Sequence, residues 1–191
     1  MTMDDNFEWV ARVLTGIIDS RDKHGREAQG VAQLARNIGR ELGLTEVAVG
    51  NLWLAGIVHD IGEGAVPPEV IARAGALDRH ERNLVEAHVE LSLRSVDESS
   101  LPHEISRILA QHHERMNGSG YPRHLKGDEI ALEARILAVA DMFSALSSGA
   151  NPETPQPEKA ARIYLVQYAG ILCDQAVVEA MVRLIRGQDS V

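Results

Sequence analysis

Acidic and histidine side chains interrupt two segments that are otherwise apolar. The segment LWLAGIVHDIG (52–62) carries the adjacent pair His59 and Asp60, and ARILAVADMFSAL (134–146) carries Asp141. A buried carboxylate without a partner is costly, so each acid needs a cation or strong hydrogen bonds. Imidazole and carboxylate ligands together suit iron, manganese, zinc or nickel. The two segments therefore indicate a metal centre at the edge of an apolar core.

Further histidines fall where helices are expected. The five on or beside predicted helices are His24, His59, His88, His112 and His113. Two divalent ions about 3.5–4 Å apart would share a bridging carboxylate and an activated water. Each residue alone has a plainer explanation: a lone histidine is more often a hydrogen-bonded core residue, and Asp141 could pair with Arg135. His80, His103 and His124 lie in polar or loop contexts and are interpreted as surface residues. Only the joint pattern favours a metal site.

The elements that must position these residues are predicted to be helices. One helical face runs through Val31, Leu34, Ala35, Ile38 and Leu42. Thr45 then caps the next helix. Further helices are predicted near 67–73, over 78–96, from Pro102, over 131–147, near 158–169 and over 174–187. The run MNGSGYP (116–122) is predicted to be a loop, and the proline-rich stretch 151–158 a surface loop. No segment alternates at period two for long, so we predict an all-α fold.

Composition limits the partners and the compartment. The chain has 191 residues and a net charge of -9, which disfavours nucleic-acid polymers and anionic membranes. Cys173 is the one cysteine, so no intrachain disulfide can form. The sequence has no secretory signal and no stretch of about 20 apolar residues. We therefore predict a cytoplasmic protein, with an N-terminal helix (1–20) that packs on the core or mediates dimerisation, and one domain (21–191).

The order of these residues resembles the HD-GYP subgroup of the HD phosphohydrolase superfamily. The matching strings are HGREAQGVAQLARNIGRELGL (24–44), HDIG (59–62), HHERMNGSGYP (112–122) and KGDEIALEARILAVADMFSAL (126–146). The similarity covers nearly the whole chain, from about residue 20 to 186, and HHE followed by GSGYP at this spacing is its most specific part. The resemblance implies the helical bundle of an HD domain.

The resemblance also implies a ligand set for two divalent ions, iron or manganese first and zinc or nickel as alternatives. One ion would be held by His24, His59, Asp60 and Asp141. Asp60 would bridge to the second, which His88, His112 and His113 would complete. Members that bind a third ion use a glutamate one turn before the first histidine. Here that position is Ser20, so two ions are expected.

The activity that the resemblance implies is hydrolysis of cyclic di-GMP to the linear dinucleotide or to GMP. A metal-bridging hydroxide, oriented by Asp60, would attack phosphorus while the ions neutralise charge on the phosphoryl oxygens. Gly120, Tyr121 and Pro122 would shape the pocket and contact a partner such as a GGDEF-type domain, or form a plain turn. Lys126, or Arg123, would supply positive charge to the substrate.

Several positions depart from the family pattern. Glu63 stands where HDIGK carries lysine, and this exchange of charge beside an anionic substrate would cost about 1–4 kcal/mol. The segment after Asp141 has no arginine between Arg135 and Arg162. Ser144 replaces a common acidic residue, and Asn117 replaces the usual aspartate.

Four functional interpretations follow. The first is a cyclic di-GMP phosphodiesterase, weakened by the departures. The second is a non-catalytic signalling or interaction module that keeps the metal site, which Glu63 and the missing arginines favour. The third is an HD phosphohydrolase acting on another nucleotide or phosphate ester. The fourth, a di-iron oxygenase, is disfavoured by the HHE and GYP motifs. The sequence leaves a homodimer open.

Overall fold

The computed structural model describes residues 24–71, 77–95, 102–148 and 157–188. Within these ranges the chain is helical, with isolated β-bridges and no strand, which confirms the predicted all-α class. The helix predicted over 1–20, Ser20, the side chain of His24 and most of 151–158 lie outside the described residues.

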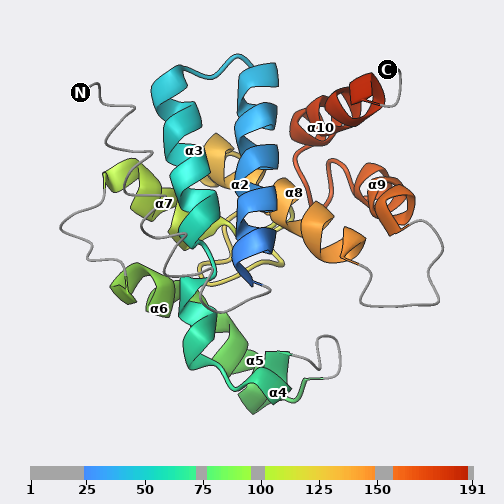
Figure 1. Ribbon diagram of the computed structural model, residues 1–191. Coiled ribbons are helices and arrows are strands. Elements are labelled where there is room, and N and C mark those ends of the chain that lie inside the picture. Colours follow the sequence, from blue (N-terminus) through green and yellow to red (C-terminus); the bar gives the residue numbers. More distant parts are fainter. Residues whose placement is uncertain (1–23, 72–76, 96–101, 149–156, 189–191) are drawn as a thin grey trace.

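Figure 1 shows the order of the helices along the chain. They are α2 (His24–Glu41), α3 (Glu46–Val58), η1 (Ile61–Ala65), α4 (Pro68–Ile71), α5 (Arg79–Glu86), α6 (His88–Ser95), α7 (His103–Gln111), η2 (Gly127–Glu129), α8 (Leu132–Ser147), α9 (Pro157–Gln167) and α10 (Gln175–Gln188). Thr45 caps α3 as predicted, because its hydroxyl accepts the Ala48 N–H at 3.3 Å. Residues 116–122 lie outside any helix, also as predicted.

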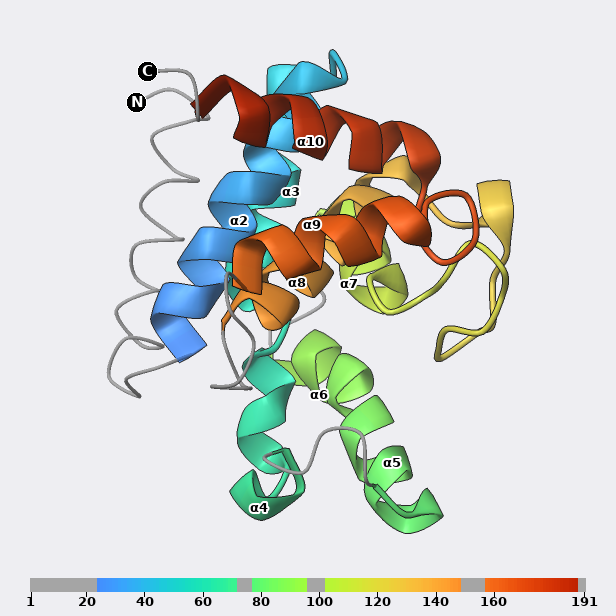
Figure 2. The same ribbon diagram turned by 90° about the vertical axis from the view of Figure 1, so that its right-hand side faces the viewer.

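The single helix predicted over 78–96 is wrong. The structure divides this segment at Ala87 into α5 and α6. No residue of α5 is buried, whereas α6 buries His88, Val89 and Ser92 against the bundle. Figure 2 shows α4 and α5 projecting from the bundle while α6 returns to it. The break therefore places His88 at the first residue of a helix that packs on η1.

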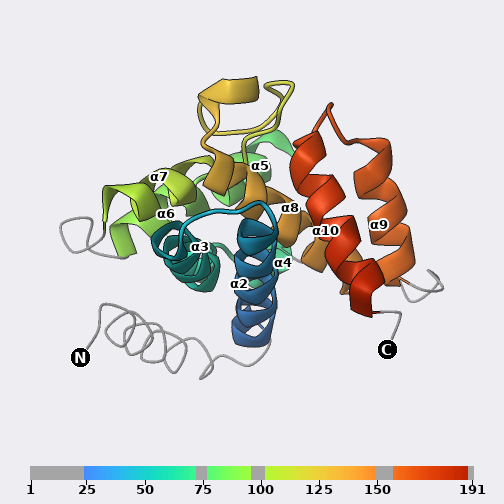
Figure 3. The ribbon, with the colours of Figure 1, turned by 90° about the horizontal axis from the view of Figure 1, so that it is seen from above.

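The core is aliphatic and lies between α2, α3, α7, α8, α9 and α10. Its largest fully buried apolar side chains are Ile38, Leu52, Ile105, Ile108, Leu109, Ile130, Ile136, Leu137, Leu165 and Met181. Seen from above, α2 stands between α3 and α10 (Figure 3), and it packs on α8. Burial of these stripes is the main stabilising term for such a bundle. The described part of the chain has no helix with the length and apolarity that a membrane crossing requires.

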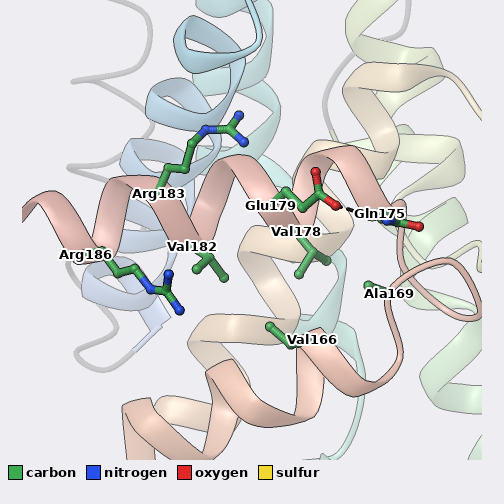
Figure 4. Close-up of a pocket in the computed structure, with 8 residues that line it drawn as sticks. All are labelled: Val166, Ala169, Gln175, Val178, Glu179, Val182, Arg183 and Arg186. Atoms are coloured by element: carbon green, nitrogen blue, oxygen red, sulfur yellow. Dashed lines mark hydrogen bonds between the residues drawn. The ribbon is translucent and has the colours of Figure 1, made fainter.

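A cleft of about 490 Å³ lies between α9 and α10. Its apolar lining is Val166, Ala169, Val178 and Val182, and its polar lining is Gln175, Glu179, Arg183 and Arg186 (Figure 4). Gln175 donates to Glu179 within the cleft, and Arg183 reaches Glu41 on α2. None of the predicted metal ligands lines it. The cleft is thus separate from the residues with metal-binding chemistry.

Candidate metal centre

The histidines and acids predicted to bind metal converge where four helices meet. His59 and Asp60 directly follow α3, His88 begins α6, His112 and His113 follow α7, and Asp141 lies within α8. Their ligand atoms form two groups, each within 4.8 Å. The groups are Asp60, His88, His112 and His113, and His59, Asp60 and Asp141. The structure thus brings together six of the seven predicted ligands. His24 begins α2, and its side chain lies outside the described residues.

Asp60 belongs to both groups because its two oxygens face different neighbours. Its Oδ1 lies 3.5 Å from Nε2 of His88 and 3.8 Å from Nε2 of His112. Its Oδ2 lies 3.0 Å from Nε2 of His59, which in turn lies 3.6 Å from Asp141 Oδ1. Nε2 of His113 lies 3.1 Å from Nε2 of His88. A carboxylate with one oxygen toward each group has the orientation that a bridging ligand requires.

Three of the imidazole rings are oriented by the end of the helix that each one follows or begins. In each, Nδ1 lies within hydrogen-bond distance of a backbone carbonyl three residues earlier. The pairs are His59 with Gly56 at 2.9 Å, His88 with Val85, and His112 with Leu109 at 2.7 Å. Donation from Nδ1 fixes the ring and leaves a lone pair on Nε2. All three Nε2 atoms then face the carboxylate of Asp60.

Within this site, two buried ligand atoms lack a hydrogen-bond partner in the described structure. Such atoms test whether the site fits a metal ion, because an ion would supply the missing partner. Among the described residues, neither Oδ1 of Asp60 nor Nε2 of His112 has a hydrogen-bond partner. A buried acceptor without a partner costs about 1–3 kcal/mol. A divalent cation would accept both lone pairs, and the nitrogen and oxygen donors suit a transition metal. The residues therefore fit the expected ions.

The electrostatics favour neutral imidazoles at His112 and His113 and an ionised carboxylate at Asp60. Burial lowers the pKa of His112 and the pKa of His113, with the neighbouring histidines lowering both further. Burial also opposes ionisation of Asp60, but the charge of His59 outweighs burial and holds the pKa of Asp60 well below its usual value. Burial lowers the pKa of His59, but the carboxylates of Asp60 and Asp141 outweigh burial and raise it well above the ordinary value. Cations bind such a set by displacing protons.

The plainer interpretations of single residues can be checked. Pairing of Asp141 with Arg135 is wrong, because Arg135 contacts Asp128 at 2.9 Å and Asp174 at 3.1 Å. Asp141 faces His59 instead. The interpretation of the remaining histidines is confirmed, since His80, His103 and His124 are all exposed.

Ser92 is a site residue that the sequence analysis missed. It is fully buried on α6, its hydroxyl donates to the carbonyl of His59 at 2.8 Å, and it accepts the N–H of Gly62 at 2.9 Å. A Cβ on Gly62 would overlap the carbonyl oxygen of His88. Ser92 therefore ties the turn that holds His59 to the helix that begins with His88. A serine in a polar helix gives no sequence signal for this role.

The GYP loop (residues 116–126) is more than a plain turn. The ring of Tyr121 stacks on His113, with centroids 4.8 Å apart and planes at 28°. Tyr121 and Pro122 are joined by a cis peptide bond. Gly120 approaches the chain so closely that a Cβ would overlap the carbonyl oxygen of His113. The loop therefore places the Tyr121 ring (the Tyr121 wall) beside the rings of His88, His112 and His113 (the imidazole cluster).

Glu114 and Lys126 belong to the same loop region. Glu114, the glutamate of HHE, is 2% exposed and accepts two backbone N–H groups of the loop. Its place in the HHE string alone indicates no role for it. Lys126 is exposed, and its aliphatic stem lies against Gly118. Its contact with a substrate stays a prediction.

Glu63 lies in η1, directly after the turn formed by His59 and Asp60 (the HD turn). Burial and the charge of Asp60 raise the pKa of Glu63 to about 7. Its carboxylate is not part of either group of ligand atoms. The negative charges of Asp60 and Asp141 nevertheless raise its pKa. The departure from the family pattern thus lies in the electric field of the centre.

Comparison with known proteins gives consistent matches. The HD domain family model matches residues 12–177. A cyclic di-GMP phosphodiesterase of Thermotoga maritima is 33% identical over 178 residues, which are 92% of this chain and 48% of that protein. The 3'3'-cGAMP-specific phosphodiesterase 1 of Vibrio cholerae is 34% identical over 139 residues, 72% of this chain and 32% of that protein. The chain spans less than half the length of these two relatives.

A solved structure supports the fold. Bd1817, an HDG"Y"P protein from Bdellovibrio bacteriovorus, superposes with a TM-score of 0.71 at 19% identity. The match covers 84% of this chain and 52% of Bd1817. At this identity the likeness shows the helical architecture alone.

Proposed function

The chain belongs to the HD domain family, in its HD-GYP branch, and from that premise we propose that it is a metal-dependent phosphodiesterase that opens cyclic di-GMP. The observation that carries the proposal is Asp60, whose two oxygens face two separate groups of ligand atoms. A phosphodiester needs positive charge on its oxygens and a strong nucleophile at neutral pH, and a two-metal site supplies both.

The residues divide naturally between two ions. His59, Asp60 and Asp141 would hold one, with His24 as the ligand predicted from the sequence. Asp60, His88, His112 and His113 would hold the other. Iron and manganese are the first choices and zinc or nickel the alternatives. When bound, the ions supply a water of lowered pKa and neutralise the phosphoryl oxygens.

The protein's own side chains prepare this chemistry. The imidazoles are held by backbone carbonyls, so they need little reorganisation when a charged ligand arrives. Ionised Asp60 keeps the two groups of ligand atoms together. Tyr121 offers an aromatic face beside His113, and aromatic faces stack on bases. The wall would therefore orient a guanine base while the phosphodiester lies at the imidazole cluster.

The relatives favour cyclic dinucleotides as the substrate class. The Thermotoga protein is named for cyclic di-GMP and the Vibrio protein for 3'3'-cGAMP, and both ligands carry guanine and two phosphodiesters. We place cyclic di-GMP first and 3'3'-cGAMP second. A partner domain at the GYP loop and a homodimer remain predictions from the sequence.

One observation favours a second function, a signalling module that keeps its ions without catalysis. Above about pH 7, where Glu63 is mostly ionised, it adds negative charge beside Asp60, where an anionic substrate would have to bind. The sequence between Arg135 and Arg162 has no arginine to offset it. Such a module would bind metal and a partner protein but turn over no cyclic dinucleotide.

The deciding experiment measures metal content and turnover together. The protein is purified with manganese or ferrous iron, its metal is counted by elemental analysis, and it is incubated with cyclic di-GMP and separately with 3'3'-cGAMP. We expect linear product from the wild type and none from Asp60→Ala. His80→Ala, which removes an exposed histidine, is the matched control and should keep activity. Two ions per chain without turnover of either dinucleotide would reject the phosphodiesterase and favour the signalling module.

A further inference from the structure

Glu114 is a buried acid, and both of the side-chain hydrogen bonds that the structure describes for it go to the backbone of the GYP loop. Its side chain is 2% exposed. Oε1 accepts the N–H of Arg123 at 2.7 Å, and Oε2 accepts the N–H of Leu125 at 3.0 Å. Hydrogen bonds to an ionised acceptor are about twice as strong as neutral ones. One carboxylate thus fixes the far end of the loop to the chain directly after His113.

The middle of the loop, at Gly120 and Tyr121, is also fixed beside His113, by close backbone contact. The N–H of Tyr121 donates to the carbonyl of His113 at 3.2 Å. A Cβ on Gly120 would meet the Cα of Glu114 at 2.5 Å, so only glycine allows the approach. Tyr121 therefore lies between two attachments, the Gly120 contact on one side and the Arg123 bond on the other. Its ring is held against His113.

We propose that Glu114 is a positioning residue that holds the Tyr121 wall over the imidazole cluster. The inference rests on the proposed function, since the wall matters only if a cyclic dinucleotide binds there. Glu114 is in neither group of metal-ligating atoms. Its carboxylate acts on the loop, and the loop acts on the substrate. Substrate binding should therefore depend on Glu114, while metal binding should not.

Glu114→Gln is the sharpest test because it keeps the size of the side chain. Glutamine retains one acceptor oxygen, but its amide NH₂ would face a loop N–H, and one buried donor would lose its partner. Glu129→Gln is the matched control. Glu129 is exposed and accepts the N–H of Lys126 at 2.8 Å in the same loop. The two variants differ in burial and in their link to Tyr121, while the chemical change is the same.

Three measurements separate positioning from general stability. Hydrogen exchange of the Arg123 and Leu125 amides should speed up by about tenfold in Glu114→Gln, since a hydrogen bond to a charged acceptor is lost. The KM for cyclic di-GMP should rise by about tenfold, within what a small misplacement costs. Metal content, and hydrolysis of the small diester bis(p-nitrophenyl) phosphate, should not change, because neither needs the wall. Glu129→Gln should match the wild type in all three.

Two outcomes overturn the proposal. The first is unchanged amide exchange and unchanged KM in Glu114→Gln. The second is parallel loss of metal and of diester hydrolysis, which would show that Glu114 supports the histidine pair instead. If Glu114→Gln does not fold, Glu114→Asp keeps the charge but is too short for both amides. Aspartate should then protect only one of the two amides, Arg123 or Leu125, from hydrogen exchange. Protection of both would refute the proposal that the length of Glu114 holds the loop.

Failure of the proposed function gives a different pattern. If the wild type turns over no cyclic dinucleotide, the KM arm is lost for every variant alike. The exchange measurement still decides whether Glu114 holds the loop, because it requires no substrate.

Discussion

The helix ends that carry the metal ligands and the GYP loop lie side by side but are fixed by different means. At the helix ends, His59 and His112 are held by carbonyls of their own helices, three residues back. In the loop, Glu114 reaches nine and eleven residues along the chain to hold Arg123 and Leu125. The first arrangement is local, whereas the second exists only after the loop has closed.

This difference suggests that the two regions can fail separately. Local hydrogen bonds orient the imidazoles as soon as the helices form, so the metal site depends on how α3, α6, α7 and α8 pack together. The attachment of the loop beside His113 involves the Glu114 carboxylate, the close approach of Gly120 and the Tyr121 N–H bond, and its loss need not disturb the bundle. Mutations in the first region should remove metal, and mutations in the second should weaken substrate binding alone.

The largest effect is expected at Asp60, the residue common to both groups of ligand atoms. Asp60→Asn keeps the shape and removes the charge that the two ions would share, so both should be lost. Turnover should fall by about a hundredfold or more, as when a group that stabilises transition-state charge is removed. Asp141→Asn changes one group only, so it should keep one ion. Elemental analysis of both variants decides this, and retention of two ions by Asp60→Asn would contradict the bridging role.

A pair of glycine substitutions compares the two regions directly. A Cβ on Gly62 would overlap the carbonyl of His88, and a Cβ on Gly120 would overlap that of His113. Overpacking of this kind costs about 1–3 kcal/mol. Gly62→Ala displaces α6 from the HD turn and should lower metal content. Gly120→Ala displaces the Tyr121 wall, so it should keep both ions and raise the KM for cyclic di-GMP.

Thermal unfolding serves as the control for this pair. Both variants should be destabilised, because each forces backbone apart. If both lost metal to the same extent, the separation of the two regions would be wrong.

Sequence reasoning predicted the helical region well because its signals are local. The helical spacing of apolar residues gave the bundle, and the acids within apolar runs gave Asp60 and Asp141, which the structure brings together. The division of the 78–96 segment at Ala87 was missed. Residues 79–95 are all compatible with one helix, and the bend reflects burial of His88 and Ser92, which a single segment cannot reveal.

The interactions that connect segments could not be predicted in the same way. Ser92 bonds to residues 33 and 30 positions earlier, and nothing in the residue type or spacing marks it. The role of Glu114 arises because the loop folds back over it. Its place in HHE was visible, but an acid beside two histidines suggests a metal ligand as readily as a loop clamp.

Ser92→Ala should give an intermediate effect within the helical region. It removes the bonds to the His59 carbonyl and the Gly62 N–H without adding bulk. Loss of a residue that orients metal ligands typically costs about 10–100-fold in metal affinity, and we expect this range from titration with Mn²⁺. Ser148→Ala is the control, since its exposed hydroxyl also donates to a backbone carbonyl, that of Ala145 at 2.9 Å. Equal affinities in the two variants would show that the packing of α6 on η1 suffices alone.

The smallest effect is expected at Glu63, whose carboxylate belongs to neither group of ligand atoms but, when ionised, adds charge beside Asp60. Above about pH 7, where Glu63 is mostly ionised, Glu63→Gln removes a negative charge from the approach to the substrate phosphate, and Glu63→Lys reverses it. Each step should lower the KM for cyclic di-GMP, by about tenfold in total if the change is worth about 1.4 kcal/mol. Because charges near the surface are screened, the gain should shrink in high salt.

The same pair of variants distinguishes two causes of a low activity. If substrate charge is limiting, KM follows the charge at position 63 while metal content stays constant. If Glu63 instead helps to hold the ions through its negative charge, Glu63→Lys lowers metal content and turnover together, and Glu63→Gln lies between. The first result would mean that Glu63, like Tyr121, affects substrate binding and not metal binding. The second would assign it to the metal side, with Asp60, and the lysine pattern of the family would then not be restorable by a single substitution.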